Sequence, residues 1–271
     1  MPTKVTISAR FCKLSGYIFV FIRFFDYLCP TMTTTRRPLV TVITVCRNAI
    51  DPLRKTMESV GGQTYENLEY LVVDGASTDG TPEMLAGYAG RLARYVSEPD
   101  GGIYDAMNKG AAMATGEWLI FMNAGDVFAA PDVLSRVFAE DRRQADVIYG
   151  DVVKGGQVKP AESPRNGHRM YFCHQSSLVR RSVFEVFPFD VSHRQSADFK
   201  QMKQLWLAGR HFCQLHFPIA DFDTTGISNT QRSAGLMDNI RIVREVDSLG
   251  EQLRLLPRLC FTWLMCRLRG K

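Results

Sequence analysis

Two acidic residues stand directly after apolar runs that are typical of buried strands. Asp74 follows residues 68–73 and opens the segment 74–81 (DGASTDGT), whereas Asp126 ends residues 122–126 (MNAGD). A carboxylate at Asp74 can accept hydrogen bonds from a ribose hydroxyl or a base N–H, and Gly75 allows close approach of a ligand to the backbone. Asp126 is placed to join a hard divalent cation to a substrate phosphate. A plain turn with helix caps and an ordinary loop acid are the alternatives that the residues leave open.

A third acid, Asp198, falls in the first turn of a predicted helix that Ser196 can cap. An acid at that place usually serves the helix dipole, and only its position relative to the other acids would make it a general base. His174 follows an apolar pair, and a buried structural histidine is its simpler interpretation. No G-x-G-x-x-G segment and no P-loop follows any predicted strand, which disfavours dinucleotide and ATP binding.

The elements that must position these acids alternate along the chain. Strands are predicted at residues 39–45, 68–73, 93–96, 118–122 and 147–149, and helices at about 52–60, from 81, at 103–114 and at 132–140. This alternation predicts an α/β fold with a mostly parallel sheet covered on both faces. Ligands of such sheets bind at the carboxyl ends of the strands, which selects residues 46–48, 74–79, 97–105 and 123–126.

Beyond residue 150 the alternation weakens. Residues 151–181 suggest irregular strands and loops, a helix is predicted from about 197 to 208, and a strand is predicted at 213–217. The sequence has no internal repeat and no low-complexity linker, so one catalytic-sized domain with terminal extensions is the simplest interpretation.

Five segments, in order, resemble the N-terminal half of inverting family 2 glycosyltransferases with the GT-A fold. They are residues 40–48 (VTVITVCRN), 63–67 (QTYEN), 72–81 (VVDGASTDGT), 97–110 (SEPDGGIYDAMNKG) and 114–118 (ATGEW). A looser match continues at residues 149–151, 174–175, 189–190, 197–199 and 226–228, so the resemblance covers roughly residues 38–230. The closest resemblance is to the branch that builds bacterial exopolysaccharide, colanic-acid-like capsule and O-antigen repeat units.

The resemblance implies a nucleotide-sugar donor and assigns residues to it. Asp74 matches the acid that contacts the nucleoside. The resemblance also implies that Thr44, Arg47 and Asn48 line this nucleoside pocket. The helix beside the diphosphate then carries Asp105 and Lys109.

The resemblance also implies a metal ion and a catalytic base. Asp126 matches the last acid of the D-x-D-type motif that holds Mn²⁺ or Mg²⁺, but Asn123 and Gly125 stand where many relatives have acids. Fewer anionic ligands weaken ion binding, so the ion would depend more on the diphosphate. Asp198 matches the base that takes the proton from the acceptor hydroxyl, and a single in-line displacement would invert the anomeric configuration.

The net charge of +5 is distributed unevenly along the chain. Residues 1–38 carry six basic side chains and one acid, and residues 254–271 carry five basic side chains and no acid. The intervening residues hold 22 basic and 27 acidic side chains. A nucleic-acid-binding protein would carry its bases on the body, so no nucleic-acid partner is expected. Basic ends favour attraction to an anionic membrane surface instead.

Both ends of the chain allow more than one interpretation. Residues 17–28 are apolar but include Arg23 and Asp26, which disfavours a membrane span. A signal peptide and an over-extended start, with the true start at Met32, remain open. Residues 236–256 predict a long amphipathic helix that Pro257 interrupts, and residues 259–266, flanked by arginines, suit a membrane interface. Packing on the domain or on a second subunit, as in a homodimer, is the alternative.

These observations predict three parts: a basic and apolar extension over 1–37, a GT-A domain over 38–235, and a membrane-associating tail over 236–271. The seven cysteines show no C-x-x-C pair, which favours reduced thiols in a cytoplasmic protein. We expect transfer of one sugar to a lipid-linked saccharide in bacterial surface polysaccharide synthesis, at the inner face of the cytoplasmic membrane. A catalytically weak scaffold or partner subunit is the alternative, because the metal motif is reduced. A nucleotidyltransferase and a processive synthase lack their expected motifs.

Overall fold

The computed structural model describes residues 37–88, 90, 92–225 and 232–269. Almost all of the predicted N-terminal extension and the segment 226–228 of the family resemblance lie outside these residues. The described strands form one sheet in the order β3-β2-β1-β4-β8-β6-β9-β5, with β7 paired to β6. Six strands (β1, β2, β3, β4, β6 and β9) run in one direction and β5, β7 and β8 in the other, so the sheet is mostly parallel, as predicted.

In the parallel half of the sheet, three neighbouring strands end at the same level, so the loops that follow them start side by side. β1 (Val40–Cys46) lies between β2 (Leu68–Asp74) and β4 (Trp118–Phe121), and β3 (Arg94–Ser97) lies outside β2. β1 is buried along its whole length, which explains its β-branched sequence without polar alternation. Cys46 pairs with Asp74, and Asp74 pairs with Ser97, so β1, β2 and β3 end side by side.

The second half of the sheet is more ordered than the sequence indicated. β8 (Ser177–Arg180) lies antiparallel between β4 and β6 (Val147–Lys154), directly after the short helix η2 (His174–Ser176). β9 (Phe212–Phe222) runs parallel to β6, and β5 (Val127–Phe128) pairs with β9. β7 (Gln157–Lys159) returns on β6 through Gly155 and Gly156, both in the left-handed region that a tight hairpin requires. The prediction of irregular strands and loops over residues 151–181 is therefore confirmed for the loop at 160–173, whereas the strands on either side of it are an ordered hairpin and a central strand.

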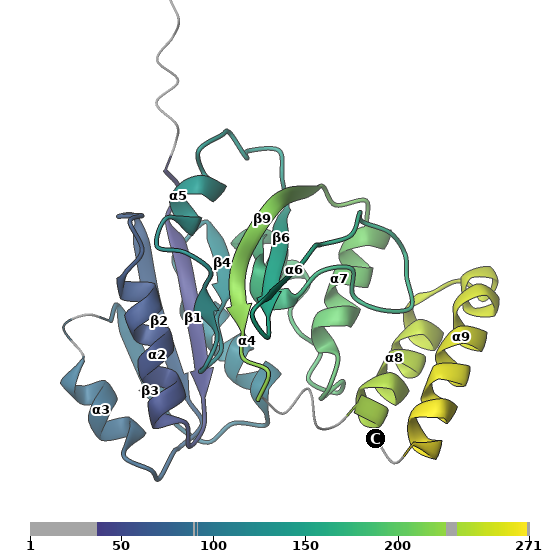
Figure 1. Ribbon diagram of the computed structural model, residues 1–271, viewed down its shortest axis with the longest axis horizontal. Coiled ribbons are helices and arrows are strands. Elements are labelled where there is room, and N and C mark those ends of the chain that lie inside the picture. The colour runs from purple at the N-terminus through teal and green to yellow at the C-terminus, as the bar shows by residue number, and fades with distance from the viewer. Residues whose placement is uncertain (1–36, 89, 91, 226–231, 270–271) are drawn as a thin grey trace, which may run out of the picture. The chain divides into compact units, whose positions relative to one another are not determined.

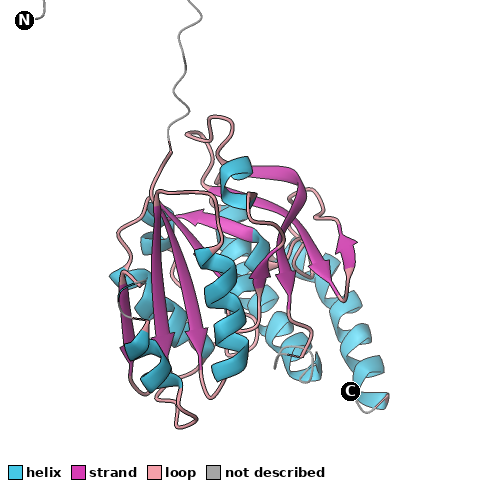
Figure 2. Ribbon diagram, turned by 60° about the vertical axis from the view of Figure 1, so that its left-hand side comes forward, coloured by secondary structure: helices cyan, strands magenta, loops and turns pink. Residues whose placement is uncertain are grey.

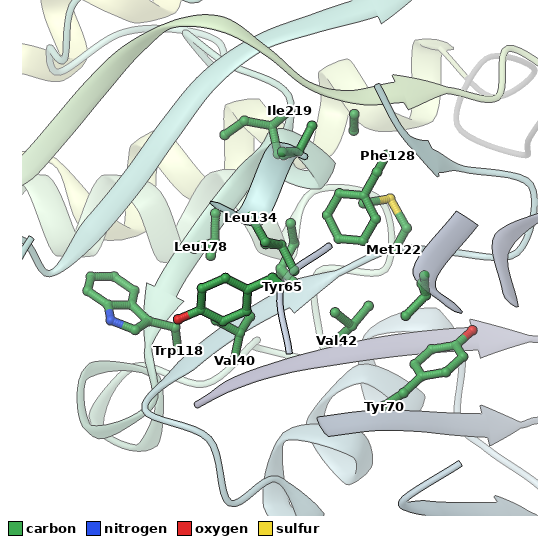
Figure 3. Close-up of a cluster of buried hydrophobic side chains, with 14 of the residues drawn as sticks. Val40, Val42, Tyr65, Tyr70, Trp118, Met122, Phe128, Leu134, Leu178 and Ile219 are labelled. Atoms are coloured by element: carbon green, nitrogen blue, oxygen red, sulfur yellow. The ribbon is translucent and has the colours of Figure 1, made fainter. Parts of the chain in front are cut away.

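Helices cover both faces of the sheet, as Figure 2 shows. One core contains side chains of α2 (Ile50–Gly61), α3 (Thr81–Gly87) and α5 (Val133–Val137). The other contains side chains of α4 (Ile103–Met113), α6 (Arg181–Val186) and α7 (Ala197–Leu207). Successive residues of β1 alternate between the two cores, with Val40 and Val42 in the first and Ile43 and Val45 in the second. Figure 3 shows Val40 in the first core beside Trp118 of β4, with Val42 further along β1.

The C-terminal helices differ from the prediction in where they break. The chain forms α8 (Arg232–Val246) and α9 (Leu249–Leu268), separated at residues 247–248, and α9 continues through Pro257. Ser248 adopts an extended backbone, and its carbonyl accepts the Gln252 N–H as α9 begins. Pro257 stays within the helix because it is exposed, where water can satisfy the carbonyl that its missing N–H leaves unbonded.

α8 and α9 pack on the α/β body through a third, smaller core. Phe199 of α7 joins Ile240 and Val243 of α8 and Leu255 and Leu259 of α9. In Figure 1, α8 lies between α7 and α9. Among the described residues, no helix is both long enough and apolar enough to cross a membrane.

Candidate active site

The loops that follow β1, β2 and β3 are held together by the Asp74 carboxylate. Asp74 Oδ2 accepts the Ser77 N–H at 3.0 Å and the Ser97 hydroxyl at 2.5 Å. Asp74 Oδ1 accepts the Ser77 hydroxyl and, at 3.6 Å, the Cys46 thiol. Since Asp74 is fully buried and both oxygens are engaged, it organises the loops around it. Its predicted contact with a nucleoside stays a prediction.

Asn48 joins the first two loops in a backbone conformation that few residues adopt. Its φ of 49° lies in the left-handed region, its N–H donates to Ser77 Oγ at 2.7 Å, and its Oδ1 accepts the Thr78 N–H at 2.8 Å. Ala76, in the second loop, also has a positive φ, of 56°. Two such non-glycine residues at one edge indicate a functional site, because their strain persists only where surrounding bonds enforce it.

Arg47 and Asp100 flank the loop backbone at Gly75. A Cβ atom at Gly75 would lie 2.3 Å from Asp100 Oδ2 and 3.4 Å from Arg47 Cδ, so only glycine leaves room for both side chains. Arg47 is exposed, as a ligand contact requires. Thr44, by contrast, is fully buried with its hydroxyl 3.1 Å from Tyr70 Oη, so the structure does not bring it to this rim.

Asp105 and Lys109 close the next loop onto α4. Asp105 accepts the Gly101 N–H at 2.8 Å, and Lys109 Nζ lies 2.8 Å from Glu98 Oε1 and 2.9 Å from the Pro99 carbonyl. The hydrogen bond with Glu98 raises the pKa of Lys109, so its ammonium stays charged. To reach a diphosphate, Lys109 would exchange its bond with Glu98 for a phosphate oxygen.

Asp126 lies buried between two segments that are distant in sequence. Its Oδ1 accepts the Asp223 N–H at 2.8 Å, and the side chain of Gln175 donates to the same carboxylate. Burial raises the pKa of Asp126 to about 7. A divalent cation would favour the ionised form, because metal ligands bind as the deprotonated carboxylate.

Asp223 supplies an acid close to the glycine of the reduced metal motif. A Cβ atom at Gly125 would lie 2.4 Å from Asp223 Oδ2, so this carboxylate occupies the space into which a side chain at position 125 would point. Asn123 Oδ1 is buried and has no hydrogen-bond partner among the described residues. Asn123, Asp126 and Asp223 are oxygen donors of the type that Mg²⁺ or Mn²⁺ prefers, although the Asp223 carboxylate also accepts the Thr225 N–H and hydroxyl. Sequence reasoning missed Asp223, which follows β9 far along the chain.

Asp198 faces the same region from the start of α7. Its Oδ1 accepts the Tyr104 hydroxyl at 2.8 Å, and the Tyr104 ring packs on Phe189 at 5.2 Å between centroids. Burial raises the pKa of Tyr104, so its hydroxyl stays protonated and donates a hydrogen bond to Asp198. Sequence reasoning missed Tyr104, although it lies within the motif 97–110.

The segment 173–175 lies near both acids. Burial raises the pKa of Cys173 to about 12, and the charges of both Asp126 and Asp198 contribute to that rise. Burial also lowers the pKa of His174, which is therefore neutral, and its Nε2 is buried without a hydrogen-bond partner. With Gln175 on Asp126, this segment brings the predicted metal ligand and the predicted base to one site.

Residues 41–206, more than half of the chain, match the family model for Glycosyl transferase family 2. The chain belongs to glycosyl transferase family 2. An uncharacterized glycosyltransferase of Mycobacterium tuberculosis (strain CDC 1551 / Oshkosh) is 30% identical over 76% of this chain and 83% of its own length. A PGL/p-HBAD biosynthesis glycosyltransferase of Mycobacterium bovis (strain BCG / Pasteur 1173P2) is 32% identical over 60% of this chain and 67% of its own length.

Solved structures show the fold of this family 2 glycosyltransferase. The mannosyltransferase PcManGT from Pyrobaculum calidifontis, in complex with GDP-Man and Mn²⁺, matches with a TM-score of 0.59 at 19% identity, over 78% of this chain and 64% of that one. S. aureus TarS 1-349 in complex with UDP matches with a TM-score of 0.59 at 17% identity, over 77% of this chain and 66% of that one. The predicted GT-A fold is confirmed.

A second acidic cluster in the glycosyltransferase is better explained as an ion-pair network. Ligand atoms of Asp190, His193 and Glu245 lie within 4.8 Å of one another. However, the Lys200 ammonium lies 2.5 Å from Asp190 Oδ2 and also contacts Glu245. The buried lysine already supplies a cation to both carboxylates, and it would repel a metal ion.

Proposed function

We propose that this family 2 glycosyltransferase is a hexosyltransferase that moves one sugar from a nucleotide-sugar donor to a saccharide acceptor with inversion. The single observation that carries the proposal is that residues 174–175 connect the two acids. Gln175 donates to Asp126, and His174 packs on Phe189, which contacts Tyr104, the hydrogen-bond partner of Asp198. An acid that binds the diphosphate through a metal ion and an acid that activates the acceptor must lie on either side of the transferred sugar. Asp126 and Asp198 supply these two acids from different elements.

The donor would lie along the carboxyl ends of β1, β2 and β3. The nucleoside would contact Asp74, Arg47 and Asn48, of which Arg47, beside Gly75, and Asn48 are exposed. Lys109 would meet the diphosphate near the start of α4. Thr44 would act indirectly: its hydroxyl bonds to Tyr70 and would hold that ring in the core beneath the loops.

The metal site would consist of Asp126, with Asn123 and Asp223 as further oxygen ligands. A divalent cation, Mn²⁺ or Mg²⁺, would neutralise the charge that develops on the leaving nucleoside diphosphate. The side chains fit that role because they are hard oxygen donors and because the Asn123 oxygen has no other described partner.

Asp198 would accept the proton of the acceptor hydroxyl as that oxygen attacks the anomeric carbon. The new bond to the acceptor oxygen forms while the bond to the diphosphate oxygen breaks, and both electrons of that bond leave with the nucleoside diphosphate. Tyr104 would hold one oxygen of Asp198 at 2.8 Å, leaving the other free to take the proton.

The acceptor is proposed to be a lipid-linked saccharide of bacterial surface polysaccharide synthesis, of the exopolysaccharide, capsule, colanic-acid or O-antigen type. The enzyme would then act as a peripheral protein at the inner face of the cytoplasmic membrane. The curated relative from M. bovis is named for PGL/p-HBAD biosynthesis, which supports a glycoconjugate product without fixing the acceptor.

One experiment separates this activity from a scaffold role, which the reduced metal motif at Asn123 and Gly125 favours. Purified protein is incubated with UDP-, GDP- and dTDP-sugars in the presence of Mn²⁺, and release of the nucleoside diphosphate is measured with and without a saccharide acceptor. We expect release from one donor class, accelerated by acceptor. A scaffold would release no nucleotide from any donor.

A further inference from the structure

The outer face of α9 exposes large apolar side chains. Of the eleven exposed large hydrophobic residues in the described part of the chain, five belong to this one helix. Leu253 is 80% exposed and Phe261 is 64% exposed. A contiguous apolar surface of this kind marks an interaction site, whereas single exposed apolar residues do not.

Four of these five side chains, together with Pro257, share one face of the helix. Positions 253, 257, 261, 264 and 268 recur at steps of three and four, which places them along one stripe. The residues that α9 buries, Leu255, Leu259 and Cys266, lie on the opposite side. α9 therefore has two apolar faces, of which one packs in the third core and the other is exposed. We call the exposed one the outer face of α9 (Leu253, Pro257, Phe261, Leu264 and Leu268).

The borders of this face are basic. Arg254, Arg258, Arg267 and Arg269 are all exposed, and no acid occurs between residues 252 and 269. Arg267 also stacks on Trp263, with its guanidinium carbon 5.3 Å from the ring centroid. An apolar stripe bordered by arginines, with an aromatic residue beside it, matches a helix that lies in the plane of a membrane interface.

We propose that the outer face of α9 binds the surface of an anionic lipid bilayer. The apolar side chains would enter the boundary between headgroups and acyl chains, and the arginines would pair with lipid phosphates. A second copy of this chain fits less well. A two-fold contact through the same face would bring Arg258, Arg267 and Arg269 of both copies together, whereas Arg254 is already paired with Glu251.

α9 is connected to the catalytic base through a short path. α8 separates α9 from α7, which carries Asp198, and the three helices share the core around Phe199 (Figure 1). The ammonium of Lys203 on α7 lies 2.7 Å from the carboxylate of Asp247, at the turn between α8 and α9, and both side chains are buried. A bilayer on α9 would thus be held at a fixed distance from Asp198. The inference deepens the proposed function by naming the surface that meets the membrane.

Vesicle sedimentation tests the proposal on the full chain, without donor or acceptor, so the result does not depend on transferase activity. Wild-type protein is mixed with phosphatidylcholine vesicles that contain or lack phosphatidylglycerol. We expect sedimentation with the anionic vesicles only, and release at high salt. The L264Q/L268Q variant should bind the vesicles at least about tenfold more weakly, since each leucine side chain that enters the bilayer contributes substantially to the binding free energy. Val158 and Val186, exposed on other elements, provide the matched control V158Q/V186Q, which should bind like wild type.

A local probe separates α9 from the basic N-terminal residues. Tryptophan is placed at Phe261, on the outer face, or at Val158 as a control, and its quenching by brominated lipids is measured against wild type. We expect additional quenching at position 261 only. Equal quenching at the two positions, or unchanged binding of L264Q/L268Q, would overturn the proposal. So would a dimer in solution that these substitutions convert to a monomer, because a second copy would then cover the face.

Discussion

Asp198 accepts the Tyr104 hydroxyl on one carboxylate oxygen, and no hydrogen bond from another described residue engages its second oxygen. We predict that Asp198→Asn lowers kcat by about 10²–10⁴-fold, the usual contribution of a general base. Donor binding should persist, because Asp198 lies on α7 and the donor loops follow β1, β2 and β3. Turnover and donor affinity are measured separately, by product release and by calorimetry.

The Tyr104→Phe variant is the matched control, because it keeps the base and removes only its hydrogen bond. We expect a smaller loss of kcat, about tenfold, with KM unchanged. Normal turnover by Asp198→Asn would show that another group takes the proton.

The metal ion is tested by removing it. EDTA should abolish transfer, and Mn²⁺ or Mg²⁺ should restore it in the wild type but not in Asp126→Asn. Asp223→Asn should require about tenfold more Mn²⁺, since it removes one anionic oxygen from the site. Mn²⁺ binding is followed by electron paramagnetic resonance, and Glu185→Gln, an exposed acid on α6, should behave like wild type. Indifference of transfer to EDTA would remove Asp126 from the metal site.

Residue types and spacing predicted the acids at strand ends but not their partners. Asp74 and Asp126 follow apolar runs, so the topology of a parallel sheet was sufficient to place both at one edge. Asp223 and Tyr104 could not be assigned, because the contacts Asp223–Asp126 and Tyr104–Asp198 span 97 and 94 residues. No local pattern records which distant side chain fills the space beside Gly125.

At the scale of elements, α4 approaches β1 unusually closely at Gly110. A Cβ atom there would lie 2.4 Å from Ile43 Cγ2 and 3.3 Å from Val73 Cγ2. We predict that Gly110→Ala destabilises the protein by about 1–3 kcal/mol, the usual cost of overpacking a core. Urea unfolding measures the change.

Gly87 of α3 provides the control for this substitution, because a Cβ atom there meets nothing within 4 Å. Gly87→Ala should change the free energy of unfolding by less than about 1 kcal/mol, in the stabilising direction. Equal destabilisation by the two substitutions would mean that the α4–β1 packing is looser than the structure shows.

Elements whose own sequence carries a long apolar or helical pattern could be predicted. Elements that exist only because they pair with strands distant in sequence could not. β1 and β2 are seven-residue apolar strands, and α4 and α7 have helical spacing that ends at a clear signal. β8 has only four residues and exists because β4 and β6 pair with it on either side. The stripe over residues 236–256 continues across the break at 247–248, so periodicity alone could not show that the helix divides there.

At the scale of the whole described chain, ion pairs tie α8 to the part that carries Asp198. Lys200 on α7 is buried, and its ammonium contacts Asp190, in the loop before α7, and Glu245 on α8. His193 joins the same network, 2.8 Å from Asp238 and 2.8 Å from Glu245. Because the loop 190–196 leads directly into Asp198, this network affects both stability and the position of the base.

The network predicts how stability depends on pH. The hydrogen bond from Lys200 lowers the pKa of both Asp190 and Glu245 in the folded protein. An acid whose pKa is lower when folded stabilises the protein above its unfolded pKa, near 4, and this stabilisation is lost as pH falls through the folded pKa. We therefore predict that Lys200→Met destabilises the protein by about 2 kcal/mol at pH 7. We expect no larger loss, because both carboxylates are partly exposed and water screens their charges.

The difference between wild type and Lys200→Met should shrink progressively as the pH is lowered below about 4, since the unfolded chains and the variant bind protons first and folded wild type binds them only at lower pH. Urea unfolding at a series of pH values measures that difference directly, and groups common to both proteins, such as Asp126 and His174, cancel. Lys159→Met is the control, because Lys159 is exposed on β7 and bonds only to Gln157 among the contacts described for it. A difference that stays constant from pH 7 to acid would show that the aliphatic packing of Lys200, and not its charge, holds α8 to α7.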